Sequence, residues 1–298
     1  MDGVVRNVHG PRKAFAVRES NLRVDRKHTS LFMDLDMTLR RDNAPVDRAM
    51  ARRAVLLGNM LYGGRMGIAS GSDINSVSKN FANPIIEQMR TTRLFPKMFM
   101  IVNNGGSVYA IEKGEIRHLY DETPLSAWEK EKIAYAVVKK TRLEMANGLL
   151  RREPKMYDRG TNVAIALLPG ASPEERNAFD SDGSYREALM ASLRLMLPQN
   201  LTVEKTGKTT ITVRNHVDKL YAIEKLAGMN NWDLGFMIYL GDEMHPGGND
   251  YPMVIGSEKH GIQSVEVNSP EDTRRIMAVI MGIQRYLDRI DDFKHNAR

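Results

Sequence analysis

Two aspartates follow a short apolar run near the start of the chain. The stretch from Leu31 is predicted to form a buried strand, apolar at residues 31–33, that ends in the two carboxylates of Asp34 and Asp36, with Leu35 between them. Because side chains alternate faces along a strand, we expect the two carboxylates to point the same way. Two acids on one face favour a hard cation such as Mg²⁺, and they could serve as a nucleophile and a general acid/base. The alternative interpretation is a strand that runs into an ordinary acidic turn.

A second turn carries hydroxyl groups. Ser70 and Ser72 follow the short predicted strand of residues 65–69, which is apolar after Arg65, just before a predicted helix. Hydroxyls and free backbone N–H groups at the start of a helix suit an anion such as phosphate. An ordinary helix N-cap uses the same residue types, so this turn alone does not establish a phosphate site. Asn104, after the apolar residues 98–102, could likewise reach a substrate or simply form a turn.

Two further segments bring charge to the same kind of position. Lys219 follows the strand-like residues 209–213, and Asp242 and Asp250 lie in a glycine-rich loop after the apolar residues 236–240. Ligands bind at the carboxyl ends of strands in open α/β sheets, so these segments are expected to meet. Together they supply what phosphoryl transfer needs: a nucleophile, a proton donor, a metal and fixed donors to the phosphate oxygens.

The elements that must position these groups alternate between strands and helices. This alternation predicts an α/β fold with a Rossmann-like core and a parallel sheet, over residues 29–112 and 208–298. Residues 113–207 have a different texture and are interpreted as an inserted α+β cap. Residues 1–28 are rich in Lys and Arg, and we interpret them as a basic, loosely ordered N-terminal extension.

Composition narrows the class of protein. The 298 residues are 42% hydrophobic, which is enough for a real core, and no apolar run is long enough to predict a membrane-spanning helix. The chain contains no cysteine, which excludes disulfides and thiolate metal sites and fits a cytoplasmic location. A net charge of +6 allows a nucleic-acid partner, but an enzyme that handles anionic phosphates fits equally well, and we do not favour nucleic acid.

The glycine-rich loop also carries a recognisable motif. Residues 241–250, Gly-Asp-Glu-Met-His-Pro-Gly-Gly-Asn-Asp, are similar to the GDxxxPGGND run of the haloacid dehalogenase superfamily. The Asp218-Lys219 pair and the segment Arg159-Gly160-Thr161 strengthen the likeness, which covers roughly residues 30–290. The chain most resembles the subgroup with a large α+β cap (type IIB), and in particular the eukaryotic-type phosphomannomutases and related phosphatases.

The resemblance implies a role for each matching residue. Asp34 would be the nucleophile that forms an aspartyl-phosphate, and Asp36 would be the general acid/base, with its backbone carbonyl as a ligand of Mg²⁺. Lys219 would neutralise the phosphoryl group and hold Asp34. Asp34, Asp242 and Asp250 would complete the metal site, with Asp250 acting directly or through water.

The remaining roles concern substrate binding. Thr38 would order the loop around the two aspartates, and Arg159 in the cap would bind the substrate. Ser70 would bind the phosphate, with Ser72 as the alternative because the neighbouring serines blur the alignment. Family members usually have glycine where this chain has Met37, and we expect this difference to alter the shape of the loop because methionine tolerates a positive φ poorly.

Three functions follow as hypotheses. We favour a Mg²⁺-dependent phosphatase acting on a sugar phosphate or a related small phosphorylated metabolite. The cap of a mutase relative carries several arginines, whereas here Arg159 is followed by the apolar residues 162–171. A phosphomannomutase-type phosphotransferase, with a cap-to-cap homodimer like that of the mutase relatives, is the alternative. The third hypothesis is a non-catalytic basic binding protein that depends on residues 1–28.

Overall fold

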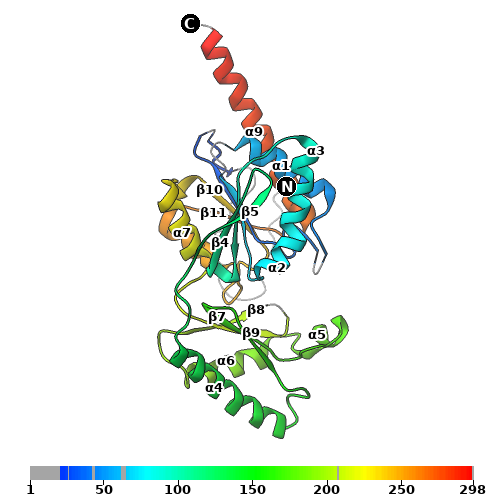
Figure 1. Ribbon diagram of the computed structural model, residues 1–298, viewed down its shortest axis with the longest axis vertical. Helices are drawn as coiled ribbons and strands as arrows, with labels where there is room; N and C mark the ends of the chain where they lie inside the picture. Colours follow the sequence, from blue (N-terminus) through cyan, green and yellow to red (C-terminus); the bar gives the residue numbers. More distant parts are fainter. Residues whose placement is uncertain (1–20, 26, 42–43, 62–64, 207, 297–298) are drawn as a thin grey trace, which may run out of the picture.

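The protein folds into two bodies, one above the other in Figure 1. The computed structural model describes residues 21–25, 27–41, 44–61, 65–206 and 208–296. The larger body is a mixed α/β core with a mostly parallel sheet, and the smaller body is a sheet with helices. The predicted α/β fold class is therefore confirmed.

The core sheet has seven strands in the order β11-β10-β1-β2-β3-β4-β5. Its parallel strands are short and fully or mostly buried, as expected when helices cover both faces. β4 and β5 form an antiparallel hairpin at one edge. The strand bounds are Ser30–Met33 (β1), Met66–Ala69 (β2), Met98–Val102 (β3), Ser107–Glu112 (β4), Glu115–Asp121 (β5), Met237–Gly241 (β10) and Gln263–Glu266 (β11).

Helices cover the sheet on both sides. One layer packs on Leu31 and Met33 of β1 and the other on Phe32, as the alternation of side chains along a strand requires. The first layer contains α1 (Arg48–Met60), α2 (Ile74–Val77), the π-helical turn Ser78–Ala82, α3 (Asn83–Thr92) and α9 (Pro270–Asn296). The second contains α7 (Lys219–Asn230) and α8 (Tyr251–His260), and short 3-10 turns span Asn103–Gly105 and Leu234–Phe236.

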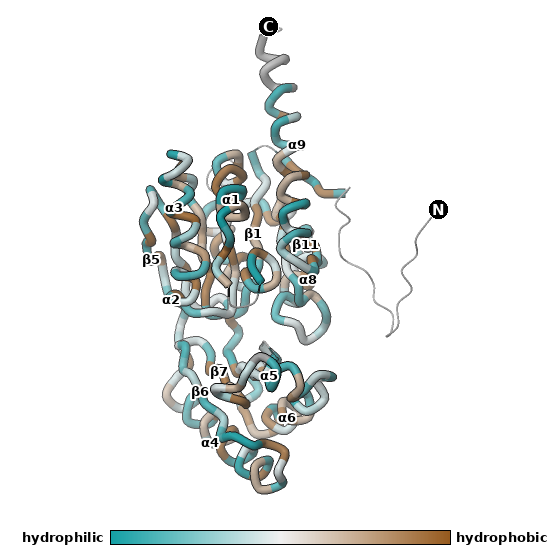
Figure 2. Tube along the Cα trace, turned by 90° about the vertical axis from the view of Figure 1, so that its right-hand side faces the viewer, coloured by the Kyte–Doolittle hydropathy of each residue, from teal (hydrophilic) through white to brown (hydrophobic). Residues whose placement is uncertain are grey.

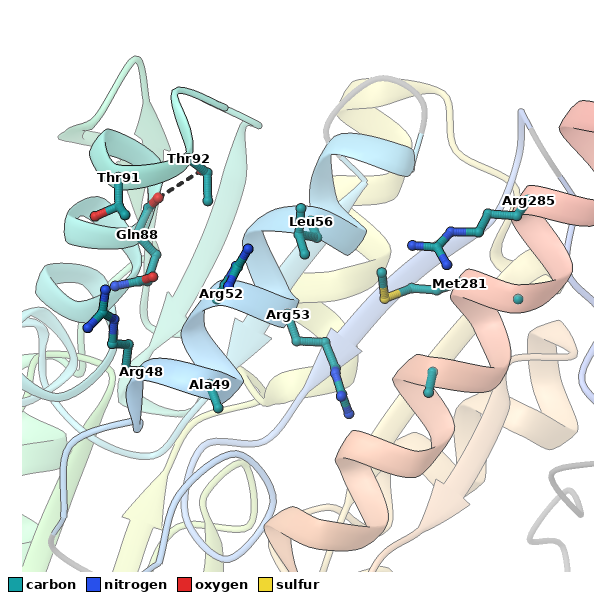
Figure 3. A pocket seen from close by; sticks show the side chains of 12 residues that line it. Arg48, Ala49, Arg52, Arg53, Leu56, Gln88, Thr91, Thr92, Met281 and Arg285 are labelled. Atoms are coloured by element: carbon teal, nitrogen blue, oxygen red, sulfur yellow. Dashed lines mark hydrogen bonds between the residues drawn. The ribbon is translucent and has the colours of Figure 1, made fainter.

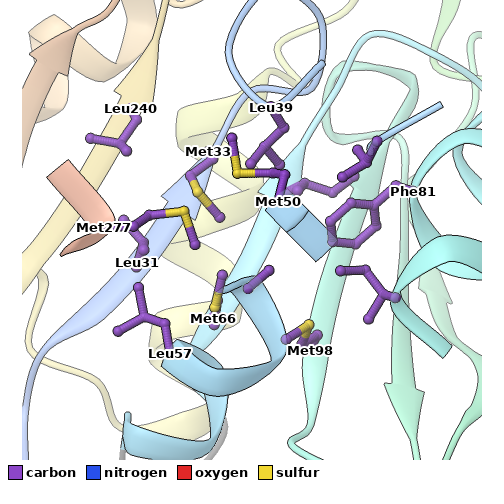
Figure 4. Packing of buried hydrophobic residues seen from close by; sticks show 14 of the residues in the cluster. Leu31, Met33, Leu39, Met50, Leu57, Met66, Phe81, Met98, Leu240 and Met277 are labelled. Carbon is purple, nitrogen blue, oxygen red and sulfur yellow. The ribbon is translucent and has the colours of Figure 1, made fainter. Parts of the chain in front are cut away.

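Methionine is prominent in the first layer. Figure 4 shows the side chains of Met33, Met50, Met66, Met98 and Met277 gathered between the sheet and its helices. Unbranched, flexible thioethers fill irregular gaps between helices and a twisted sheet. Figure 2 shows the hydropathy of the whole chain, with hydrophobic colour concentrated toward the interior and hydrophilic colour toward the outside.

The smaller body is a four-stranded antiparallel sheet in the order β6-β7-β9-β8. The apolar side chains of one sheet face, including Val163, Ile165 and Ile211, pack with residues of α4 and α6. Figure 1 shows these two helices on the side away from the core, so the other sheet face is directed at the core. The bounds are α4 Ala127–Ala146, β6 Lys155–Asp158, β7 Asn162–Ala166, α5 Pro173–Phe179, α6 Ser184–Arg194, β8 Thr202–Thr206 and β9 Thr210–Arg214.

The limits expected for the insert are residues 113 and 207, and a strand follows closely after each of them. β5 pairs with β4 and extends the core sheet to Asp121, while β9 pairs with β7 and β8 and extends the smaller sheet to Arg214. Short strand-like segments flank both limits, and a local sequence does not reveal which sheet such a strand joins. From this pairing we propose limits for the cap at about residues 122 and 215.

The N-terminal extension expected over residues 1–28 lies largely outside the described residues, which begin at residue 21. The described part is not a loose tail. The Arg23 guanidinium donates to the Gly261 carbonyl at 2.8 Å, Gln263 donates to the Arg23 carbonyl at 2.9 Å, and Leu22 packs into the core. In the part of the chain that the structure describes, no helix has the length and apolarity needed to cross a bilayer.

Candidate active site

Asp34 lies at the end of the central strand. β1 ends at Met33, and the Asp34 N–H continues the pairing with β10 by donating to the Leu240 carbonyl at 2.8 Å. The Asp34 side chain is buried, with 4% of its surface exposed. Its carboxylate accepts a hydrogen bond from Lys219 Nζ at 2.6 Å. The first strand thus delivers its acid into a dry site beside a cation.

Lys219 is the first residue of α7, next to the N-cap residue Asp218. Its side chain is 1% exposed and donates to Asp34, to Asn249 at 2.8 Å and to Asp250 at 2.7 Å. An ammonium group has three hydrogens, so these acceptors satisfy it completely. Burial acts to lower the pKa of Lys219, but the carboxylates of Asp250 and Asp34 outweigh burial and raise that pKa, which keeps the group charged.

Three carboxylates meet around this ammonium group. Asp34, Asp242 and Asp250 each offer an oxygen within 4.8 Å of the others. One lysine against three carboxylates leaves a formal charge of −2 in a buried space, which one divalent cation neutralises. The donor set is entirely oxygen and anionic, which suits Mg²⁺ rather than a softer metal. The residues present therefore fit the predicted cation.

The loop after β10 is built around Asp250. The Tyr239 hydroxyl donates to Asp250 at 2.6 Å, and the Glu243 N–H donates to its other oxygen at 3.3 Å. A Cβ on Gly241 would stand 2.5 Å from the Asp250 carboxylate, so only glycine lets the strand pass so close. The motif glycine is thus a steric requirement of the acidic cluster.

Electrostatics in the cluster lead to a testable pH dependence. Burial, followed by the charges of Asp250 and Glu243, raises the pKa of Asp242 to about 7. Below that pH a proton competes with a cation for the carboxylate. We expect the apparent Mg²⁺ affinity to rise by up to about tenfold per pH unit between pH 6 and 7 and to level off above pH 7. Titration calorimetry at several pH values measures this, and a flat profile would contradict it; Asp242→Asn should bind weakly with little pH dependence.

Comparison with known protein families identifies the family of this chain from a match in its second half. The family model described as eukaryotic phosphomannomutase matches residues 133–283, slightly more than half of the sequence. The chain belongs to the eukaryotic phosphomannomutase family. The matched region contains Arg159, Lys219, Asp242 and Asp250, and the structure joins Asp34 to this set through the contact with Lys219.

Solved structures similar to this phosphomannomutase-family chain include a nucleotidase and a protein described as a hydrolase. The N-terminally truncated, IMP-bound IMP-nucleotidase of Plasmodium falciparum is similar over 87% of this chain and 69% of its own, with a TM-score of 0.65 and 12% identity. A haloacid dehalogenase-like hydrolase from Bacteroides thetaiotaomicron is similar over 89% of this chain and all of its own, with a TM-score of 0.52 and 15% identity. At these identities the likeness concerns the fold. No curated protein sequence matches the chain.

Asp36 is placed differently from the expectation for a strand. β1 ends before Asp34, so strand alternation does not orient the two aspartates, and that part of the prediction is wrong. The Asp36 carboxylate pairs with Arg40 at 2.7 Å and is not part of the three-carboxylate cluster. The apolar sequence pattern continues through Leu35, but the backbone turns at Asp36, where the Thr38 N–H donates to the Asp36 carbonyl at 2.7 Å. The Thr38 side chain is fully buried beneath this turn.

Met37 occupies the position where the sequence resemblance predicts glycine. Its φ is +55°, in the left-handed region that costs an L-residue energy. We expect Met37→Gly to raise the free energy of unfolding by up to about 1 kcal/mol, because glycine removes that cost but loses more chain entropy on folding. Urea unfolding measures the difference. Met37→Ala is the matched control and should give no gain, and equal stabilities for the two variants would contradict the explanation.

The two candidate phosphate-binding serines are also separated by the structure. Met33 of β1 stands opposite Ile68 of β2, so Ser70 follows the neighbouring strand end close to Asp34. Ser70 is 1% exposed, and its hydroxyl accepts from the Ser72 N–H at 3.1 Å, which leaves the hydroxyl proton for a phosphate oxygen. Ser72 is more exposed and supplies a positioning hydrogen bond. This arrangement favours Ser70 over Ser72 as the phosphate ligand.

The cap contacts the same loop. The Arg159 guanidinium donates to the Gly71 carbonyl at 2.8 Å, and Asn162 donates to the Asn103 carbonyl at 3.0 Å. Asn104 is buried with a φ of +54°, and its side chain lies against Gly71, where an added Cβ would be 2.9 Å from its oxygen. The smaller body therefore closes on the loops that follow β2 and β3.

Two residues at the site received no role from the sequence. Asn249 accepts from Lys219, and Tyr239 holds Asp250. Asn249 is part of the glycine-rich motif, so the motif itself was the available signal. Tyr239 is the polar member of an apolar strand, and its residue type was compatible with ordinary packing; only the fold shows that its hydroxyl reaches Asp250.

Proposed function

We propose that the protein is a Mg²⁺-dependent phosphatase that acts on a small phosphorylated metabolite through an aspartyl-phosphate at Asp34. The observation that carries the proposal is the buried contact of Asp34 with Lys219 beside Asp242 and Asp250. A carboxylate that is held by a cation in a dry site is fixed for attack on phosphorus. Mg²⁺, when bound by Asp34, Asp242 and Asp250, would supply positive charge to the phosphoryl oxygens.

The reaction would run in two displacements. An Asp34 oxygen bonds to phosphorus while the bond from phosphorus to the leaving oxygen breaks, and Asp36 donates a proton to that oxygen. Water then attacks the aspartyl-phosphate as Asp36 takes a proton from it, and inorganic phosphate leaves with Asp34 restored. The contact between Asp36 and Arg40 must loosen for this role, because a protonated carboxyl gives up its ion pair.

The cap favours hydrolysis over phosphate migration between positions of a bisphosphate. Two of its cations are already paired: Arg214 Nε donates to Glu204 at 2.9 Å, and Lys205 pairs with Glu187 at 2.7 Å. A mutase must hold a second phosphate at a distance from the first, and cations bound to carboxylates serve that purpose poorly. A phosphomannomutase-type phosphotransferase remains the second candidate because the family match supports it.

The test is a phosphate-release screen with Mg²⁺ across sugar phosphates, with mannose 1-phosphate assayed in parallel for conversion to mannose 6-phosphate. IMP belongs in the screen because the structural neighbour is described as an IMP-nucleotidase. We expect phosphate release that EDTA stops. Conversion of mannose 1-phosphate without phosphate release would identify a mutase. Retention of function in Asp34→Asn and its loss on removal of residues 1–28 would favour a basic binding protein.

Location and assembly are part of the same proposal. The lack of cysteine fits a cytoplasmic enzyme, and a cap-to-cap homodimer would resemble that of mutase relatives. Size-exclusion chromatography with light scattering measures directly whether the protein is a dimer.

A further inference from the structure

A groove with several arginines lies on the outer helices of the core, apart from the active site. We call it the Arg groove. It has a volume of about 810 Å³, within the usual size range of small-molecule sites. Figure 3 shows α1 in the middle, with α3 on one side and α9 on the other. The groove is lined by Arg48, Ala49, Arg52, Arg53, Leu56, Gln88, Thr91, Thr92, Ala278, Met281, Gly282 and Arg285.

The charge of the Arg groove is unbalanced. Four arginines line it and no acidic residue does. In the described part of the chain, Arg48, Arg52 and Arg285 form no ion pair, whereas Arg274 close by pairs with Asp47. Like charges that line one groove without counter-ions repel each other, so the groove favours an anion.

Gln88 is a second, independent sign of a ligand. Its side chain lines the groove although only 2% of the residue is exposed, and its amide oxygen is buried without a hydrogen-bond partner among the described residues. Figure 3 shows this side chain beside Arg48, between α3 and α1. A buried carbonyl oxygen of this kind lacks a donor, and a turn of the Gln88 side chain toward the groove would let a ligand hydroxyl supply one.

The shape of the groove indicates the size of the ligand. Figure 3 shows Arg48 and Arg285 on opposite sides of α1, with Arg52 and Arg53 between them. Ala49, Ala278 and Gly282 are small and leave room, and Leu56 and Met281 add apolar surface. The groove thus has positive charge at two separated ends and a partly apolar centre. This arrangement suits one small organic ligand that carries two anionic groups.

We propose that the Arg groove binds a small soluble metabolite that carries two phosphate groups and free hydroxyls, such as a sugar bisphosphate. Phosphates would meet the arginines at the two ends, and a hydroxyl would donate to the Gln88 oxygen. The phosphates of a nucleic acid could also bind the arginines, but they would need neither a hollowed site nor the buried acceptor oxygen of Gln88. The proposal does not depend on the reaction at Asp34.

The test is titration calorimetry on the full chain in EDTA, with fructose 1,6-bisphosphate as the probe. Arg52→Gln with Arg285→Gln removes one charge from each side of the groove. Arg142→Gln with Arg151→Gln removes the same charge from exposed cap positions and is the matched control. We expect the groove pair to weaken binding at least about tenfold and the control pair to change it less than about twofold.

Other probes distinguish the alternatives. Gln88→Leu should weaken binding of fructose 1,6-bisphosphate and leave that of inorganic tripolyphosphate unchanged, with thermal unfolding used to show that the variant is folded. Equal losses in the groove and control pairs would overturn the proposal. The proposal would also be overturned if the groove variants weakened the binding of single-stranded RNA, or of vesicles that contain phosphatidylinositol bisphosphate, and left the binding of fructose 1,6-bisphosphate unchanged.

Discussion

Replacing Asp34 with asparagine is expected to reduce phosphate release by at least about 10³-fold while the protein stays folded. The amide cannot form the aspartyl-phosphate, but it has nearly the same shape, and its oxygen can still accept from Lys219, which now lies at 2.6 Å. Burial raises the pKa of the Asp34 carboxyl well above its usual range, which shows that the charge is costly to hold there. Loss of activity with unchanged or higher stability is therefore the expected combination.

The measurement pairs phosphate release with thermal unfolding in EDTA. Asp158→Asn is a suitable control, because it removes one carboxylate from an exposed position in the cap. It should keep most of the activity. An active Asp34→Asn variant would remove the proposed nucleophile from the mechanism, even though the fold and the acidic cluster would remain as described.

Replacing Lys219 with methionine is expected to have the largest effect on stability. The substitution leaves Asp34, Asp250 and Asn249 without their shared donor in a site that is almost fully buried. Removing one partner of a buried ion pair costs about 3–5 kcal/mol. We therefore expect a loss of this size in the free energy of unfolding in EDTA, together with loss of phosphate release.

Two changes of condition should reverse part of the loss in Lys219→Met. Mg²⁺ supplies positive charge to the same carboxylates, so millimolar Mg²⁺ should restore some stability. Low pH should act similarly: Lys219 acts to lower the pKa of Asp242, which is about 7 in the unmutated protein, so removing Lys219 raises that pKa further. Protonation of Asp242 then favours the folded variant more strongly at low pH, and this contribution is lost as the pH rises above 7. Urea unfolding at pH 6 and pH 8 measures the sign, and a variant equally stable at both would contradict it.

Much of the candidate active site could be proposed from local sequence. Asp34, Ser70 and Asp242 each follow a short apolar run, and parallel strands bring such ends to one edge of a sheet. The glycine-rich loop could be predicted for a similar reason, since a motif of fixed spacing describes one continuous piece of backbone. Met37 is instructive as well, because the residue that departs from the expected glycine is among those found with a positive φ.

Other parts of the structure depend on contacts between segments that are distant in the sequence, and the types of the residues involved are compatible with several arrangements. Asp36 was expected beside Asp34, but a turn begins before strand alternation can act, and Arg40 pairs with it. The strands at both limits of the cap joined different sheets from those expected, because pairing partners are chosen by tertiary packing. The Arg groove also required the fold, since Arg48 and Arg285 are 237 positions apart in the chain.

The sequence by itself determined which side chains could perform chemistry and in which order strands and helices would present them. Strand ends, caps and glycine-rich turns are properties of a few neighbouring residues, and their physics is local. Only the tertiary structure decided that one lysine would serve Asp34, Asn249 and Asp250, and that three outer helices would leave an arginine-lined hollow. Charges interact through space over a few ångströms, and the distance along the chain does not specify that separation.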